Sequence, residues 1–249
     1  MMSERQLLMS ERDLGATIDL ALNPRQIAPG FISRQAEIAG PVPLPPKFID
    51  RCRQVYLSIP TDEGGDHRLI GITSSSHGEG KTSLAIGMAM AVAADTQEPT
   101  LLVECDLERP ALSRLLGFQP RPGLGDWLEG AANLRIIRVA PLANLFLIPA
   151  GSPPSDPARI FYQLSDSKLM AELKPRFQNV IIDLPPMLNI AYSSLATKLA
   201  DRIVLVARYG VTPIDDIEQS VFLLGRERLV GLVLNGTDYK TPEWLRRAF

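Results

Sequence analysis

One short segment of the chain combines the residue types that bind phosphate groups. It reads Ser76-His77-Gly78-Glu79-Gly80-Lys81-Thr82-Ser83 and stands between an apolar run and an Ala-rich run. Glycines let backbone N–H groups turn toward phosphate oxygens, a lysine can reach the β and γ phosphates of a nucleotide, and a hydroxyl can ligate Mg²⁺. We therefore predict that residues 76–83 bind ATP, that Lys81 also acts in catalysis, and that Thr82 is a metal ligand.

The match to the phosphate-loop pattern G-x-x-x-x-G-K-[ST] is incomplete. Ser75 stands where the pattern has its first glycine. The alternative is a Gly-rich turn with an incidental lysine. A strand predicted before the loop and a helix predicted after it favour the phosphate loop, because the pattern requires both. Within the segment we interpret His77 as a loop residue rather than as a catalytic base.

Carboxylates follow two other apolar runs. Val180-Ile181-Ile182 ends in Asp183, and Leu101-Leu102-Val103 is followed by Glu104 and Asp106 with one residue between them. An isolated acid after a strand is usually a helix cap or a turn residue. Parallel strands, however, bring their carboxyl ends to one edge of a sheet, where a phosphate loop also lies. We therefore predict that Asp183 holds Mg²⁺ directly or through water.

Short apolar runs alternate with helical patterns over most of the chain. Strands are predicted at 69–72, 101–105, 145–148, 180–182, 203–207 and 229–234. Helices are predicted at 48–59, 81–94, 112–116, 124–128, 158–173, 191–199 and 214–224. Nearly continuous apolar strands are typical of strands covered on both faces. The alternation predicts an α/β fold of the P-loop NTPase type, a doubly wound and mainly parallel sheet with helices on both faces.

Composition argues against several classes of protein. The formal net charge of −2 offers no basic footprint, so we expect no nucleic-acid partner. Two cysteines and two histidines, without a C-x-x-C pair, support neither a disulfide framework nor a zinc site. The most apolar stretch, 84–94, is shorter than the ~20 residues needed to cross a bilayer, and the amino-terminal residues lack the layout of a signal peptide. We expect a cytoplasmic protein without a transmembrane segment of its own.

The predicted domain has a segment on each side of it. Residues 1–47 end in a Pro-rich stretch and are interpreted as a tail and linker, within which 11–22 could form an amphipathic helix or remain a partly ordered extension. Residues 48–240 are the predicted P-loop domain. The short tail 241–249 contains Trp244, which could dock on a partner or membrane surface or cap the core of the domain.

The order of several motifs resembles the cytoplasmic domain of bacterial tyrosine kinases, which regulate capsule and exopolysaccharide export. The resemblance runs from about Phe48 to Asn235. It includes the phosphate loop, 101–110, Pro122-Gly123-Leu124-Gly125-Asp126, Ile148-Pro149-Ala150-Gly151, 153–158, Ile182-Asp183-Leu184-Pro185-Pro186, Ala200-Asp201 and 231–235. Several of these pieces have little in common with generic phosphate-loop proteins.

The resemblance implies roles for individual residues. Glu104 and Asp106 match the paired catalytic acids of that family, of which one helps to deprotonate a tyrosine hydroxyl and the other organises the metal. Asp183 matches the acid that completes the catalytic site, and Asn235 matches a residue that contacts adenine. The resemblance also implies a membrane-embedded polysaccharide co-polymerase, or chain-length regulator, as partner. That partner would hold the protein at the inner face of the cell membrane.

The chain departs from the family pattern in three places. Glu104 stands where the family has aspartate, one methylene shorter. The family tail carries closely spaced tyrosines, whereas this chain has Tyr239 alone after the last predicted strand. The ring-forming Glu-x-x-Arg-x-x-Arg motif aligns with Asp50-Arg51-Cys52-Arg53-Gln54-Val55-Tyr56, so a homo-oligomer and a plain surface helix both stay possible.

Three functions therefore stay open. The first is a protein-tyrosine kinase or kinase-like ATPase in polysaccharide export. The second is a catalytically weak switch whose nucleotide state controls oligomerisation and partner binding. The third is a partitioning-type ATPase, which the sequence disfavours because Ser76 stands where those proteins have a second lysine.

Overall fold

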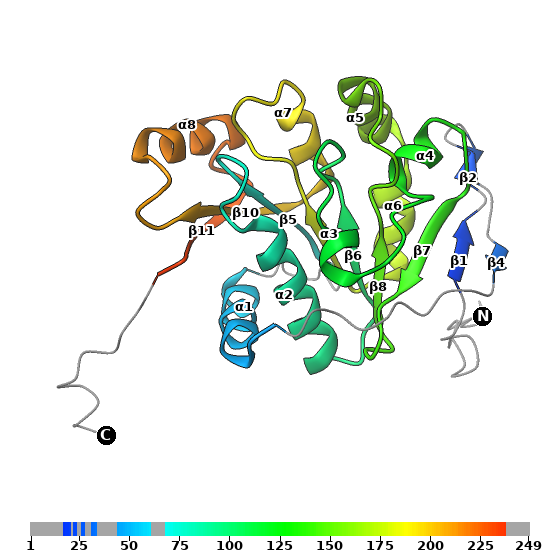
Figure 1. The fold of residues 1–249 in the computed structure, drawn as a ribbon, viewed down its shortest axis with the longest axis horizontal. Helices are drawn as coiled ribbons and strands as arrows, with labels where there is room; N and C mark the ends of the chain where they lie inside the picture. The colour runs from blue at the N-terminus through cyan, green and yellow to red at the C-terminus, as the bar shows by residue number, and fades with distance from the viewer. Residues whose placement is uncertain are drawn as a thin grey trace, which may run out of the picture.

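The structure is a computed structural model that describes residues 17–20, 22–23, 26–27, 31–33, 44–60 and 68–237. Its main feature is a twisted sheet with helices on both faces (Figure 1). The strands of this sheet follow the order β11-β10-β5-β9-β6-β8-β7-β1-β4. Their bounds are β1 Thr17–Leu20, β4 Phe31–Ser33, β5 Arg68–Ser74, β6 Thr100–Glu104, β7 Leu134–Arg138, β8 Leu145–Ile148, β9 Asn179–Asp183, β10 Arg202–Arg208 and β11 Leu229–Asn235. A separate pair is formed by β2 Leu22–Asn23 and β3 Gln26–Ile27.

Neighbouring strands from β11 to β8 pair in parallel, as predicted. The carboxyl ends of β5, β6, β9, β10 and β11 therefore share one edge of the sheet. Strand β7 pairs antiparallel to β8, and β1 pairs antiparallel to both β7 and β4. The doubly wound α/β fold predicted from the sequence is confirmed, with an antiparallel edge added to its parallel centre.

Helices cover the two faces of the sheet. They are α1 Pro46–Ser58, α2 Lys81–Asp95, α3 Leu112–Leu116, α4 Leu124–Leu128, α5 Pro157–Asp166, α6 Leu169–Leu173, α7 Ser193–Ala196 and α8 Ile214–Leu224, with short 3-10 turns η1 Lys174–Arg176 and η2 Thr197–Leu199. One core cluster joins α2 to the inner strands through residues such as Ile72, Leu84 and Ile181. The other joins the opposite face to α4, α5 and α8 through Leu101, Phe161 and Leu224. The central strands are thus buried on both sides.

The structure differs from the predicted elements in a few places. The helix predicted at 158–173 is two helices, because α5 ends at Asp166 and the Ser167 N–H and hydroxyl both donate to carbonyls of its last turn. Strands β7 and β1 were not predicted. Thr17–Leu20 lies in β1, where a helix over 11–22 was one of two alternatives. Leu22 lies in β2, and residues 11–16 and 21, most of residues 1–43 and the tail 241–249 lie outside the described residues.

Candidate nucleotide-binding site

The phosphate loop connects β5 to α2 at the shared edge of the sheet. It turns twice into the left-handed region, at Gly78 with φ +84° and at Gly80 with φ +102°. Only glycine adopts such angles without strain. At Gly80 an added Cβ would also lie 2.0 Å from Asn235 Nδ2, so a larger side chain would displace the Asn235 amide. The loop therefore delivers the chain to the N-terminus of α2, whose free N–H groups and dipole favour an anion.

Lys81 and Thr82, the first residues of α2, both contact the carboxylates predicted from the sequence. Lys81 Nζ lies 2.7 Å from Asp106 Oδ2 and 3.3 Å from Asp183 Oδ1. Thr82 Oγ1 donates to Asp183 Oδ2 at 2.8 Å. These four residues come from α2, from the end of β9 and from just after β6. The parallel register, in which Glu104 of β6 lies opposite Asp183 of β9, brings the two acidic strand ends together.

The ammonium group of Lys81 is buried, with 7% of the side chain exposed. Burial by itself would lower the pKa of Lys81, but the carboxylates of Asp183 and Asp106 outweigh burial and raise it. The lysine is therefore charged at neutral pH, while burial raises the pKa of Asp183 against the opposing effect of Lys81 and the Thr82 hydrogen bond. A nucleotide phosphate would have to compete with these carboxylates for Lys81, or bring a cation to replace it.

The Glu104 carboxylate is bonded to the backbone rather than to Lys81. Its carboxylate accepts hydrogen bonds from the backbone N–H groups of Leu112, at 2.7 Å, and Ala150, at 3.1 Å. The side chain is fully buried, and burial raises its pKa to about 7. The catalytic role of Glu104 therefore stays a prediction, with its carboxylate bonded to backbone amides in this structure. The glutamate side chain reaches the two amides and joins α3 to the end of β8, and it does not contact Lys81.

Glu79 and Asn235 fix the conformation of the phosphate loop through hydrogen bonds. Glu79 is buried and accepts hydrogen bonds from the Ser75 N–H at 2.9 Å and from Thr212 Oγ1 at 2.8 Å. Asn235 Nδ2 donates to the Glu79 carbonyl at 2.9 Å, and Asn235 Oδ1 accepts from the Gly236 N–H at 2.9 Å. Both residues were predicted to bind nucleotide, which stays a prediction, and in this structure both fix the shape of the loop through these contacts. Thr212 was not predicted, because no motif marks it.

The remaining loop residues lie nearer to solvent. His77 Nδ1 lies 3.7 Å from Asp106 Oδ2 with 31% of the side chain exposed, and burial lowers its pKa, so the ring is mainly neutral at pH 7. The Ser76 carbonyl accepts from the Ser74 hydroxyl at 2.7 Å. Ser83 is half-buried in the first turn of α2. Of the residues predicted to bind nucleotide, Gly78 is exposed, and Ser76 and His77 are half-buried.

The residues Thr82, Asp106 and Asp183 fit Mg²⁺. Within the described ranges no three His, Cys, Asp or Glu side chains are grouped as a metal site. Mg²⁺ does not need such a group, because it keeps several waters and is usually bound by one or two carboxylates together with substrate phosphates. A hydroxyl and two carboxylates beside a phosphate loop supply that donor set.

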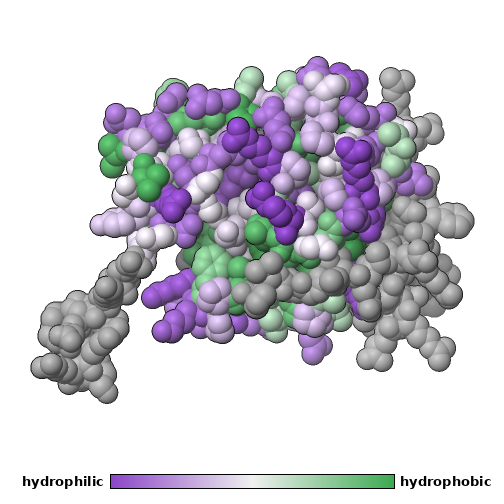
Figure 2. All heavy atoms as spheres, viewed as in Figure 1, coloured by the Kyte–Doolittle hydropathy of each residue, from purple (hydrophilic) through white to green (hydrophobic). Residues whose placement is uncertain are grey.

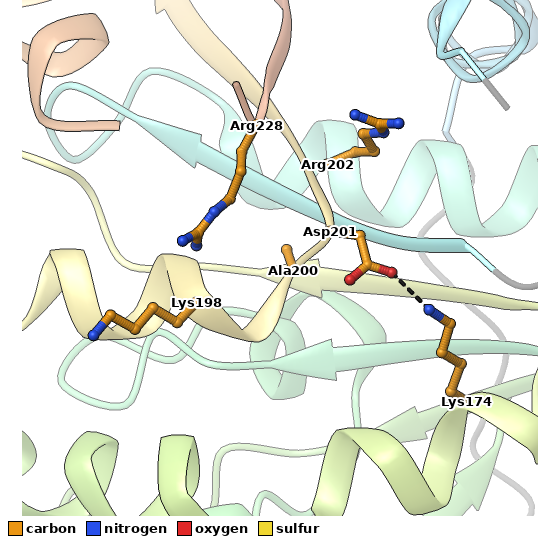
Figure 3. A pocket seen from close by; sticks show the side chains of 6 residues that line it. All are labelled: Lys174, Lys198, Ala200, Asp201, Arg202 and Arg228. Atoms are coloured by element: carbon orange, nitrogen blue, oxygen red, sulfur yellow. Dashed lines mark hydrogen bonds and ion pairs between the residues drawn. The ribbon is translucent and has the colours of Figure 1, made fainter. Parts of the chain in front are cut away.

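Two cavities lie at opposite ends of the parallel strands. One, of about 860 Å³, is lined by Gly80, Leu84 and Asn235 together with residues of α1 and β11, so it adjoins the loop. The other, of about 600 Å³, lies where β10 begins and is lined by Lys174, Lys198, Ala200, Asp201, Arg202 and Arg228 (Figure 3). Lys174 is paired there with Asp201 at 2.9 Å. Of these two cavities, the first adjoins the phosphate loop.

Comparisons of the sequence point to one group of proteins. No family model matches the chain. The chain is 29% identical over 167 residues to the tyrosine-protein kinase wzc of Salmonella typhimurium and 31% identical over 183 residues to the succinoglycan biosynthesis transport protein ExoP of Rhizobium meliloti. These matches cover 66% and 70% of this chain but 23% of each relative, so the chain matches about a quarter of their length. It is 28% identical to the tyrosine-protein kinase CpsD of Streptococcus pneumoniae over 80% of this chain and 90% of CpsD.

Solved structures agree with the sequence comparisons. The kinase domain of the Escherichia coli tyrosine kinase ETK superposes with a TM-score of 0.67 at 23% identity, over 76% of this chain and 75% of that one. The VpsO kinase domain superposes with a TM-score of 0.63 at 27% identity, over 77% of this chain and 99% of that one. Among the described residues no helix has the length and apolarity to span a membrane. In sequence and fold the chain is therefore similar to the bacterial tyrosine kinases, and its fold is that of the P-loop proteins.

Proposed function

We propose that this chain is a Mg-ATP-dependent protein-tyrosine kinase that regulates polysaccharide biosynthesis and export. The observation that carries the proposal is the convergence of Lys81 and Thr82 on Asp106 and Asp183 at the edge of the sheet where the phosphate loop lies. The names of the relatives supply the substrate class. Tyrosine transfer and the export pathway are therefore inferences from likeness, while the phosphate chemistry follows from the residues themselves.

Each residue of the site has a distinct task in this proposal. Lys81 binds the β and γ phosphates, and the loop N–H groups bind the phosphate oxygens. When bound, Mg²⁺ neutralises charge that develops on the phosphates, and Thr82 and Asp183 are placed to hold it. Asp106, released from Lys81 by the phosphates, accepts the tyrosine proton while the phenolic oxygen attacks the γ phosphorus and ADP leaves. A tyrosine with a pKa near ~10 needs such an acceptor at neutral pH.

The phosphate acceptor is Tyr239, one of the exposed Tyr162 and Tyr209, or a tyrosine of another protein. Tyr56 and Tyr192 are poor acceptors, because Tyr56 donates to Asn179 Oδ1 at 2.6 Å and Tyr192 is 5% exposed. Tyr239 lies outside the described residues. By likeness to the family, the partner is a membrane-embedded polysaccharide co-polymerase that keeps this cytoplasmic domain at the inner face of the membrane. A homo-oligomer is also proposed, although Arg53 of the aligned motif pairs within the chain with Asp50 and Asp95.

A second function is favoured by the position of Glu104. Of the expected catalytic pair, Glu104 is bonded to the backbone, so only Asp106 of that pair contacts Lys81. A chain with that site could bind and hydrolyse ATP slowly and use its nucleotide state to control partner binding. In that case the protein is a switch in the same pathway rather than an efficient kinase.

The test is incubation of the purified chain with γ-labelled ATP and Mg²⁺, with and without a tyrosine-containing peptide. Label on tyrosine and in free phosphate is measured for the unmodified chain, for Asp106→Asn and for Glu98→Gln, a control that removes an exposed carboxylate at the other end of β6. The kinase predicts tyrosine label that Asp106→Asn alone abolishes. Free phosphate without tyrosine label supports the switch. Equal tyrosine label and equal free phosphate in all three chains contradict the role of Asp106 as proton acceptor and its role in the phosphate site.

A further inference from the structure

The cavity of about 600 Å³ lies at the amino ends of the parallel strands, away from the phosphate loop. All but one of its lining residues are charged, and cations outnumber carboxylates. The lining consists of Lys174, Lys198, Ala200, Asp201, Arg202 and Arg228 (Figure 3). The face viewed in Figure 2 instead mixes hydrophilic with apolar residues, and the whole chain has a formal net charge of −2. The cavity is therefore a local concentration of positive charge.

The cations are carried by regular elements rather than by long loops. Lys174 begins η1, Lys198 lies in η2, and Arg228 directly precedes β11. The Arg228 carbonyl accepts from the Ile203 N–H at 2.8 Å, and Arg228 Nη1 donates to the Thr197 carbonyl at 3.3 Å. A guanidinium has five N–H donors, so this contact orients the side chain without exhausting its donors. The structure thus fixes Arg228 before any ligand arrives, as a binding site requires.

Asp201 adds a hydrogen-bond acceptor to the cavity. Lys174 Nζ contacts Asp201 Oδ2 at 2.9 Å, so this cation is paired within the chain. The other carboxylate oxygen of Asp201 points toward the side on which Lys198 and Arg228 lie (Figure 3). An ionised carboxylate only accepts hydrogen bonds, so its partner in a ligand must be a donor such as a hydroxyl. The cavity thus offers cations for an anion and, beside them, an acceptor for a hydroxyl.

Charge and size together indicate the class of ligand. Like charges held close together repel one another, and a bound anion relieves that repulsion. Guanidinium and ammonium groups are the side chains that bind phosphate oxygens. The volume lies within the range of small-molecule pockets, ~300–1,000 Å³. A nucleic acid or a bilayer contacts a broad basic surface, whereas these charges line a recess.

We propose that this cavity binds a small phosphorylated molecule that carries a hydroxyl group near its phosphate, such as a sugar phosphate. Lys198 and Arg228 bind the phosphate oxygens, and the Asp201 carboxylate accepts a hydrogen bond from the hydroxyl. The cavity and the phosphate loop lie at opposite ends of the parallel strands, so both sites can be occupied at once. This inference does not depend on the proposed kinase activity.

Calorimetric titration of the full chain with glucose 1-phosphate tests the proposal, because this probe has a hydroxyl on the carbon next to its phosphate. The unmodified chain should bind one molecule. Lys198→Gln combined with Arg228→Gln should weaken binding at least ~10-fold, since a single charged hydrogen bond contributes about that factor. The matched control is Arg114→Gln combined with Arg159→Gln, which removes two exposed cations from α3 and α5 and should leave the affinity unchanged.

Lys198→Gln alone separates the loss of a ligand contact from the loss of the fold. Lys198 is exposed, whereas Arg228 also contacts the Thr197 carbonyl. Lys198→Gln should therefore keep the melting temperature of the unmodified chain and still bind glucose 1-phosphate more weakly. Raising the salt concentration should weaken binding to the unmodified chain as well, because exposed charges are screened. A Lys198→Gln variant with unchanged affinity contradicts the proposal.

Other ligands and other sites give different results. Inorganic phosphate that binds as tightly as glucose 1-phosphate removes the role of the hydroxyl and overturns the proposed class. No binding of glucose 1-phosphate overturns the proposal, and vesicles of anionic lipid that bind the unmodified chain but not the double variant then assign the cations to a membrane surface. Binding that Lys81→Met abolishes and the double variant keeps places the probe at the phosphate loop and also overturns the proposal.

Discussion

Removal of the Glu79 side chain tests whether a buried carboxylate shapes the phosphate loop. Glu79 accepts from the buried Ser75 N–H and from the Thr212 hydroxyl, so it connects the loop to the segment between β10 and α8. Glu79→Ala leaves the Ser75 N–H buried without its acceptor. Glu79→Gln keeps an amide oxygen for Ser75 and an amide N–H that can donate to Thr212.

The magnitudes follow from these contacts. An unsatisfied buried N–H costs about 1–3 kcal/mol, and loss of the Thr212 hydrogen bond adds about 0.5–1.5 kcal/mol. We expect Glu79→Ala to lower the free energy of unfolding by roughly 2–4 kcal/mol and Glu79→Gln by about 1 kcal/mol. In a domain of this size, each kcal/mol shifts the melting temperature by about 2–4 °C. The alanine variant should also bind ATP more weakly than the glutamine variant, because its loop is no longer held in the binding shape.

Urea unfolding followed by circular dichroism gives the stability, and calorimetric titration with ATP and Mg²⁺ gives the affinity. Thr212→Val is the control for the Thr212 contact alone. The reasoning is refuted if Glu79→Ala unfolds within about 0.5 kcal/mol of the unmodified chain, the range of ordinary surface substitutions. It is also refuted if the glutamine variant is as unstable as the alanine variant.

Three further predictions concern other buried groups. Lys81→Met should lower the free energy of unfolding, measured in urea, by about 3 kcal/mol, because two buried carboxylates lose their positively charged partner. Mg²⁺ should restore part of the lost stability. A variant that is as stable as the unmodified chain without Mg²⁺ would contradict the ion pairs. Burial opposes ionisation of Asp126, but hydrogen bonds from Ser152 and the Gly123 N–H outweigh burial and lower its pKa. The stability that Asp126 contributes is therefore complete above the unfolded pKa of ~3.9, and it is lost as pH falls through the lower folded pKa. The difference in melting temperature between the unmodified chain and Asp126→Asn should therefore shrink in acid. A difference that stays constant with pH would contradict this reasoning. Burial raises the pKa of Cys52 to about 12 and that of Cys105 further, so mass spectrometry should find neither thiol alkylated by iodoacetamide at pH 8 unless urea is present.

Several features of the fold were predictable because they depend on local pattern. Apolar strands covered on both faces give continuous runs, and six such runs became β5, β6, β8, β9, β10 and β11. The phosphate loop was predictable for a similar reason, because two glycines before a Lys-Thr pair at a strand-to-helix junction satisfy a local requirement. Strand β7 was missed because Leu134–Arg138 interrupts its apolar residues with two arginines at an antiparallel edge.

The roles of single side chains required the tertiary structure. The sequence by itself determined that Lys81, Thr82 and the acidic strand ends occur in a P-loop order, and that parallel pairing would gather them at one edge. Whether a carboxylate then faces the loop or the backbone depends on which amides its side chain can reach. Asp106 lies beside Lys81, whereas Glu104 reaches the amides of Leu112 and Ala150, which are 8 and 46 residues away in the chain. Contacts between such distant segments leave no local pattern, so only the folded chain decided them.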